Sequence, residues 1–352
     1  MRKKTFPSAV LRDNNRRAWR PGPNREGSSY MRRLIGLAAI VGTAILVASS
    51  SAAPPGGQGE TIPTAPGHGI VPTWAASMAS PWAHGAFRPT YGSGQLRYHG
   101  GSTMTTNNTY AIYWQPSNWS KQFPSGYSTL VNQYFGDVAA DSGKTSNVYY
   151  TETQYSGIQY KSTFAGSAVD SDPLPANGCS DSATSVCVSD AQLATEVSNF
   201  VSSHGLPRNS TTEYFVYFAP GVGSCLGSSG CAFTDYCAYH NSSGTGSGAL
   251  IYANMPYVEN VSGCDAGHHP NALPGDATIN VTSHEHNESI TDEFGNAWYD
   301  IAGYEDGDKC AWSWGSPTGS GSTAYNQTIN GHHYMLQLEY SNADRGCVMT
   351  GL

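Results

Sequence analysis

The chain has 352 residues, with 18 Lys and Arg against 26 Asp and Glu and a formal net charge of −8. This length suffices for one large domain or two small ones. Ten of the basic residues lie in the first 33 positions, so the rest of the chain carries eight basic and 24 acidic residues. So few cations cannot neutralise many phosphates, which argues against nucleic acid and anionic membranes as partners.

The N-terminal 53 residues have the layout of an export signal. A basic stretch precedes the apolar run at 34–48, and the small residues "SSSAA" follow it. This order predicts an N-terminal extension and a secretory signal peptide over residues 1–53, cleaved near Ala53, and hence a secreted, extracellular protein. The apolar run is about 15 residues long, which disfavours a membrane anchor, so no membrane contact is expected after signal removal.

Residues 54–90 are rich in Pro, Gly, Ala and Ser and carry few charges. This composition predicts a flexible linker or a short pro-segment. We therefore expect the folded domain to span residues 91–352.

Within that domain, strand-like and helix-like segments are interspersed. Aromatic and β-branched residues predict strands at 108–114, 147–155, 213–219 and 249–258. Apolar residues at helical spacing predict helices at 126–141 and 190–205, while Gly-rich and Ser-rich composition predicts loops at 222–248 and 315–324. An α+β domain fits this pattern best.

All eight cysteines follow the predicted signal peptide. An even number in an exported chain predicts four disulfides. Proximity in the sequence favours the following pairs, although sequence alone leaves other pairings open: Cys179 with Cys187, Cys225 with Cys231, Cys237 with Cys264 and Cys310 with Cys347.

The stretch "SHEHNESITDEF" at 283–294 is the main candidate for chemistry. Asp276 is placed to cap a helix that runs to about Glu293, and His284 and Glu288, four residues apart, would share one face of it. Histidine nitrogen and carboxylate oxygen both suit Zn²⁺. Glu285, beside the first ligand, is then the candidate general base for a metal-activated water. The alternative is a polar helix whose side chains are simply solvated.

A third ligand has to come from outside this turn. Glu305 in "YEDGDKC" follows Glu288 by 17 residues and is the favoured ligand, and Asp308 would orient His284. The alternative for this stretch is an acidic loop, or a calcium site formed by Glu305, Asp306 and Asp308.

Four further polar residues bear on this site. Asp292, one helical turn further on, and His240, beside a cysteine, are alternative ligands or supporting residues. Tyr299 follows the helix and could donate a hydrogen bond to a developing oxyanion, with core packing as the alternative. His286 points elsewhere on the helix and is not expected to bind metal.

Four blocks of the chain resemble the exordium family, also called phosphate-induced proteins. They are "LRYHGG" with "NTYAIYWQPSNW", "YFVYFAPG" with "CAYH", "GDATINVTSHEHNESITDEFGNAWYD", and "EDGDKC" with "YNQTINGHHYMLQLEYSNADRGC". Together they cover roughly residues 95–350. In this resemblance His284, Glu285 and Glu288 match the family's His-Glu-x-x-Glu, and Asp308 and Cys310 match its Gly-Asp-x-Cys.

The resemblance implies a zincin-like single domain with a mixed sheet and an active-site helix. It favours a secreted zinc metallopeptidase acting on a peptide or protein substrate, with Zn²⁺ as cofactor and a structural Ca²⁺ as a further option. Glu288 in place of a second histidine would weaken the metal as a Lewis acid. The alternative function is therefore a non-catalytic extracellular protein that binds cell-wall components and holds a structural metal.

Overall fold

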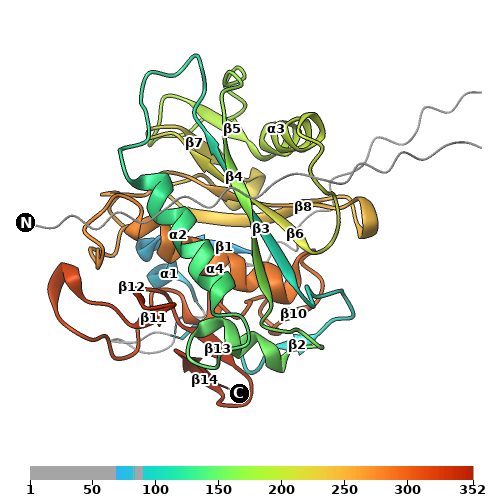
Figure 1. Ribbon diagram of the computed structural model, residues 1–352, viewed down its shortest axis with the longest axis vertical. Coiled ribbons are helices and arrows are strands. Elements are labelled where there is room, and N and C mark those ends of the chain that lie inside the picture. The colour runs from blue at the N-terminus through green and yellow to red at the C-terminus, as the bar shows by residue number, and fades with distance from the viewer. Residues whose placement is uncertain (1–68, 82, 84–89, 352) are drawn as a thin grey trace, which may run out of the picture. The chain divides into compact units, whose positions relative to one another are not determined.

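The computed structural model describes residues 69–81, 83 and 90–351, and the predicted signal peptide lies outside them. The chain divides into two units, Met1–Ala53 and Pro54–Leu352. The second unit has the α+β fold that the sequence predicts, built on a mixed sheet (Figure 1). In the described part of the chain, no helix combines the length and apolar character needed to cross a bilayer.

The main sheet has six strands in the order β1-β8-β9-β6-β3-β4. Strands β9, β6, β3 and β4 run parallel, β8 is antiparallel to β9, and β1 is antiparallel to β8 at the edge. In sheet order the strands are β1 (Ile70–Pro72), β8 (Tyr236–Ser243), β9 (Leu250–Met255), β6 (Thr212–Phe218), β3 (Asn107–Trp114) and β4 (Ser162–Asp170).

Two layers of helix cover the two faces of this sheet (Figure 1). Alternate side chains of a strand point to opposite faces, so Phe215 and Tyr217 of β6 pack toward α2 (Tyr127–Ala140) and α4 (Asp276–Asp292). Tyr214, Val216 and Phe218 of the same strand pack toward α3 (Asp190–Ser203).

The predicted helix at 190–205 is confirmed as α3, and the apolar side chains that share one face of it are buried: Leu193, Val197, Phe200 and Val201. Gly205, at φ 61°, lies just beyond the helix end, where a left-handed residue is common.

Shorter elements complete the unit. Small strand pairs are β2 (Arg97–Tyr98) with β10 (Trp298–Tyr299), β5 (Cys187–Ser189) with β7 (Gly223–Cys225), β11 (Gln327–Ile329) with β12 (His332–Tyr334), and β13 (Glu339–Ser341) with β14 (Gly346–Val348). The short helices are α1 (Trp74–Ala79), η1 (Val148–Gln154), η2 (Gly227–Ser229), η3 (Gly246–Gly248), η4 (Asp308–Cys310) and η5 (Gly321–Thr323).

Two predicted elements are wrong. The strand predicted at 147–155 is the 3-10 helix η1, because Asn147 accepts a hydrogen bond from Tyr149 N and starts a turn. Tyr149 and Glu152, three residues apart, are both buried, which suits a helical turn and not a strand. The loop predicted at 222–248 contains β7 and β8. Strand β7 pairs with β5, and β8 pairs with β9 and β1, so pairing makes strands of a segment whose composition suggests none. The predicted linker at 54–90 contains β1 and α1.

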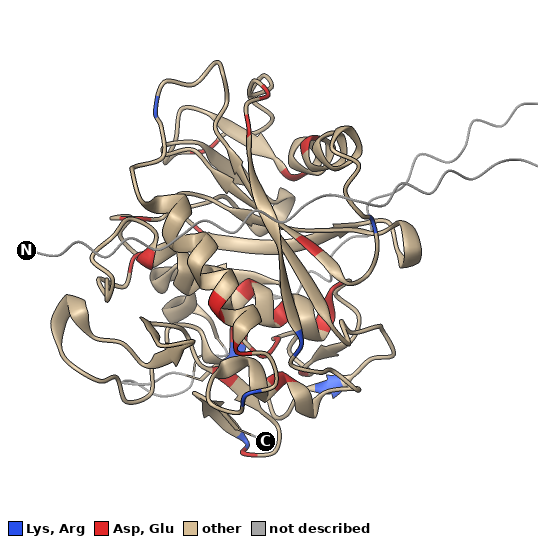
Figure 2. Ribbon diagram, in the orientation of Figure 1, with Lys and Arg blue, Asp and Glu red and all other residues tan. Residues whose placement is uncertain are grey.

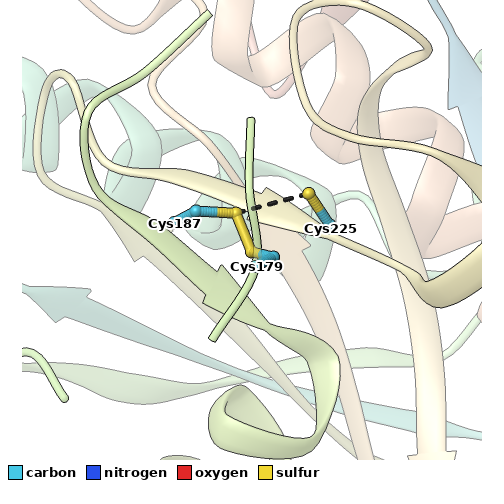
Figure 3. A group of neighbouring side chains, drawn as sticks. All are labelled: Cys179, Cys187 and Cys225. Carbon is cyan, nitrogen blue, oxygen red and sulfur yellow. Dashed lines mark hydrogen bonds between the residues drawn. A yellow bond between two sulfur atoms is a disulfide. The ribbon is translucent and has the colours of Figure 1, made fainter. Parts of the chain in front are cut away.

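The four predicted disulfides are confirmed: Cys179–Cys187, Cys225–Cys231, Cys237–Cys264 and Cys310–Cys347. The first two lie next to each other, since the Sγ atoms of Cys187 and Cys225 are 3.3 Å apart (Figure 3). Because these sulfurs are oxidised, they are not thiolate ligands for a metal.

Candidate metal centre

Helix α4 is polar in sequence and buried along its whole length. Gly275, at φ 114°, occupies the N-cap position and has no side chain to cap the helix. Glu259, from outside the helix, caps its N-terminus instead. Its Oε1 accepts hydrogen bonds from Gly275 N (2.9 Å), Thr278 N (3.0 Å) and Thr278 Oγ1 (3.0 Å). Asp276, predicted as the cap, is instead the first helical residue.

Glu288 lies at the centre of a group of buried polar side chains. Its Oε1 is 2.8 Å from His284 Nε2, on the same helix face, and accepts a hydrogen bond of 2.8 Å from Asp308 N. Its Oε2 is 3.6 Å from Nδ1 of His240, which comes from β8. One carboxylate therefore joins helix α4, strand β8 and the first residue of η4.

The first possible ligand group consists of His240, Glu288 and Glu305, which offer atoms within 4.8 Å of one another. One atom of each side chain is held in place: His240 Nδ1 by Glu285 Oε2 at 3.1 Å, Glu288 Oε1 by Asp308 N, and Glu305 Oε2 by Gly69 N. Glu288 Oε2 and Glu305 Oε1 have no hydrogen-bond donor among the described residues. His240 Nε2 is 3.9 Å from Glu305 Oε1 and His240 Nδ1 is 3.6 Å from Glu288 Oε2, so both of these carboxylate oxygens lie close to the His240 ring.

The second possible group consists of His284, Glu288 and Asp308. Gln337 Oε1 accepts a hydrogen bond from Trp312 N (2.7 Å), which identifies this atom as the oxygen, and it lies 3.3 Å from His284 Nδ1. His284 Nδ1 must therefore carry the proton, and its Nε2 lone pair faces Glu288 Oε1 and Asp308 Oδ1, the latter at 3.9 Å. A lone pair between two carboxylates requires a cation there, either a proton or a metal ion.

Burial sets the protonation of these groups. It lowers the pKa of His240 to about 4, which leaves a neutral imidazole suited to metal binding. Burial raises the pKa of Glu288 to about 8 and the pKa values of Glu305 and Asp308 well above their ordinary range. Figure 2 shows Asp and Glu residues concentrated along α4 and in the segments beside it. A divalent cation would favour the charged form of these carboxyls, so the donor set fits a metal.

Glu285 lies beside the first ligand group. Its Oε2 contacts His240, and its Oε1 accepts a hydrogen bond of 3.1 Å from Val71 N of β1. Because Gly69 N also binds Glu305, the segment around β1 covers both glutamates. Burial raises the pKa of Glu285 to about 8.

Asp292 and Tyr299 belong to neither group of three. Asp292 Oδ1 accepts hydrogen bonds from Asn296 N and Ala297 N and closes the turn after α4. Tyr299 is partly buried on β10 and stacks on His99, with 3.6 Å between the ring centroids. Both remain close enough for Asp292 to raise the pKa of Tyr299, after the larger effect of burial.

His286 lies outside the site, as predicted. Its Nδ1 is 2.9 Å from the Tyr149 hydroxyl and its Nε2 is 3.0 Å from Asn107 Oδ1. Sequence reasoning missed Gln337 and the backbone of Gly69. Gln337 is a single amide between the buried apolar residues Leu336 and Leu338, and a polar residue in such a place could have been recognised as a candidate for a buried site. Nothing in the sequence marks a backbone N–H group as a donor to the site.

No family model, curated protein or solved structure matches this chain. The resemblance to the exordium family therefore stays a prediction, and the geometry of the site carries the functional argument.

Proposed function

We propose that this protein is a secreted zinc-dependent hydrolase, a zincin-like metallopeptidase. The observation that carries the proposal is the convergence of His240, Glu288 and Glu305, which are each held through one atom and offer ligand atoms within 4.8 Å of one another. Four disulfides are in keeping with an oxidising, extracellular location.

These three side chains would hold Zn²⁺, with His284 and Asp308 adjoining it through Glu288. Bound zinc supplies a Lewis acid and lowers the pKa of its water. Glu285 would accept the proton from that water, because a nearby cation lowers the pKa of a buried carboxyl and leaves it ionised and basic near neutral pH.

Strand β1 supports a peptide as the substrate. It adds to the sheet antiparallel to β8, with Ile70 opposite Tyr239. The N–H group of its central residue binds Glu285, and the N–H group of the residue before the strand binds Glu305. An extended peptide could pair with β8 in the same way once β1 has left. We therefore assign β1, within the predicted pro-segment at 54–90, the role of closing the site until it is displaced.

Glu285→Gln tests the proposal. The substitution removes the proposed base but none of the three ligands, so peptide cleavage should fall by at least a hundredfold while the zinc content stays at that of the wild type. Mass spectrometry should find about one zinc per chain in the secreted protein and none after His240→Ala or Glu288→Ala. Undiminished cleavage by Glu285→Gln would refute the assigned base, and zinc-free wild type would refute the site.

The second candidate function is a non-catalytic extracellular binding protein with a structural metal. Its supporting observation is the burial of Glu285, Glu288 and Glu305, each with no exposed surface. It predicts zinc that resists small chelators and a protein that cleaves no peptide even when β1 is weakened.

A further inference from the structure

A third group of buried side chains, made of carboxylates alone, shares no residue with the two groups around Glu288. Glu152 of η1, Asp306 and Glu339 of β13 come from three distant parts of the chain, and none has exposed surface. Their oxygens lie within 4.8 Å of one another. Asp306 thus points to this group, whereas its neighbours Glu305 and Asp308 belong to the groups around Glu288.

The hydrogen bonds in this group leave one side of each carboxylate open. Thr291 Oγ1 donates to Asp306 Oδ1 (3.2 Å), and Asn287 Nδ2 donates to Glu339 Oε1 (3.2 Å). Among the described residues there is no donor for Asp306 Oδ2, for Glu339 Oε2 or for either carboxylate oxygen of Glu152. The Asn287 Oδ1 atom, on the same amide that binds Glu339, also has no donor there.

Charge compensation is missing too. In the described part of the chain, no ion pair joins Glu152, Asp306 or Glu339 to a Lys, Arg or His. Buried carboxylates without a partner are strongly unfavourable, and three together repel one another. Either protons or a bound cation must neutralise them.

We propose that Glu152, Asp306 and Glu339 form a calcium site. All the open atoms of these three side chains are carboxylate oxygens, the ligands that hard cations prefer, and no nitrogen or sulfur takes part. Calcium accepts six to eight oxygens in irregular geometry, whereas Mg²⁺ keeps several waters that a fully buried site disfavours. This inference stands apart from the proposed hydrolase function.

The site would also steady the loop that carries Glu305 and Asp308. Asp306 lies between these two residues, and its backbone oxygen accepts a hydrogen bond from Tyr340 N (3.1 Å) next to Glu339. A cation at Asp306 would therefore hold this loop against β13.

Thermal unfolding of the secreted, full-length protein tests the proposal. After metal is stripped with EDTA and the chelator is removed, CaCl₂ at about 100 times its dissociation constant should raise the Tm by roughly 5–10 °C, and MgCl₂ by less. Mass spectrometry should find one calcium per chain that treatment with phenanthroline, which removes zinc, leaves in place. If the wild type holds no calcium and CaCl₂ does not raise its Tm, the three carboxyls share protons and the proposal fails.

Two substitutions and two control variants test whether the rise in Tm with calcium depends on these three carboxylates. Glu152→Gln and Asp306→Asn should lose most of the calcium-dependent rise in Tm. Glu213→Gln, which alters another fully buried carboxylate, and Glu305→Gln, which alters the neighbouring zinc group, should keep it. A full calcium response in Glu152→Gln would overturn the assignment. If that variant does not fold, the wild-type titration and Asp306→Asn decide, and zinc content, measured separately, reports on the hydrolase proposal alone.

Discussion

Gln337 determines which nitrogen of His284 faces Glu288, a proposed zinc ligand. Its Oε1 is committed to Trp312 N and therefore accepts from His284 Nδ1, which turns Nε2 toward Glu288. His284 acts on the proposed zinc through its contact with Glu288, and outer-shell partners of this kind typically change metal affinity 10- to 100-fold.

Gln337→Leu should therefore weaken zinc binding by about 10- to 100-fold, measured by competition with a chromophoric chelator. Gln327→Leu is the matched control, because Gln327 is also buried but bonds to Met349 O, away from the site. Equal losses of affinity in the two variants would show that His284 needs no orientation by Gln337.

At the scale of elements, β1 is the part of the fold whose position limits access. It is an edge strand of three residues, bonded on one side to β8 and covering Glu285 and Glu305. Val71 is fully buried and fixes the strand against the core that contains α4.

Val71→Ala should raise the rate of peptide cleavage. Loss of two buried methyl groups costs about 1–2 kcal/mol, enough to increase the population of displaced β1 by roughly tenfold. The rate on a quenched fluorescent peptide measures this. Val258→Ala removes the same groups from an equally buried position outside β1 and should not raise the rate. If neither variant changes the rate of an active protein, β1 does not close the site.

Glu196 lies on α3, on the face of the sheet opposite α4, and we expect it to make the stability of the protein depend on pH. Its pKa is raised to about 8, first by burial and then by the charge of Asp170 on β4. The folded protein keeps a proton that the unfolded chain releases near pH 4.5. The contribution of Glu196 to the free energy of unfolding is therefore most favourable below about pH 4.5 and is lost as the pH rises to about 8.

Glu196→Gln should therefore flatten the fall in Tm between about pH 4.5 and 8 and should be more stable than wild type at pH 8. Thr195→Ala, next to it on the exposed side of α3, adds no change in titration and should follow the wild-type curve. A Gln variant whose Tm falls as steeply as that of the wild type would mean that Glu196 titrates normally.

At the scale of the whole molecule, periodic segments and cysteine spacing predict most of the fold. Helices α2 and α3 and strands β3, β6 and β9 follow from apolar period and composition, and each disulfide joins cysteines that proximity pairs. Strand β8 could not be predicted, because its sequence "YCAYHNSS" forms a strand only through its neighbours. Helix η1 was missed because Asn147 overrides the strand preference of the aromatic residues after it.

The site also has one part that the sequence predicts and one part that only the tertiary structure reveals. The contact of His284 with Glu288 follows from helical spacing alone. The approach of His240, on the unpredicted β8, depends on tertiary structure, and so does the division of "EDGD" between two clusters. Local sequence cannot say which way consecutive acidic side chains of a loop will point.

The burial of all 17 residues of α4 has a consequence for hydrogen exchange. A polar helix enclosed on every side has no face from which it can fray, so its amide hydrogens should be reached by deuterium only when the whole unit opens. An ion bound to its carboxylate Glu288 would stabilise the closed state and slow exchange along the full helix. The deuterium uptake of α4 would thus report the occupancy of the proposed zinc site without any substrate.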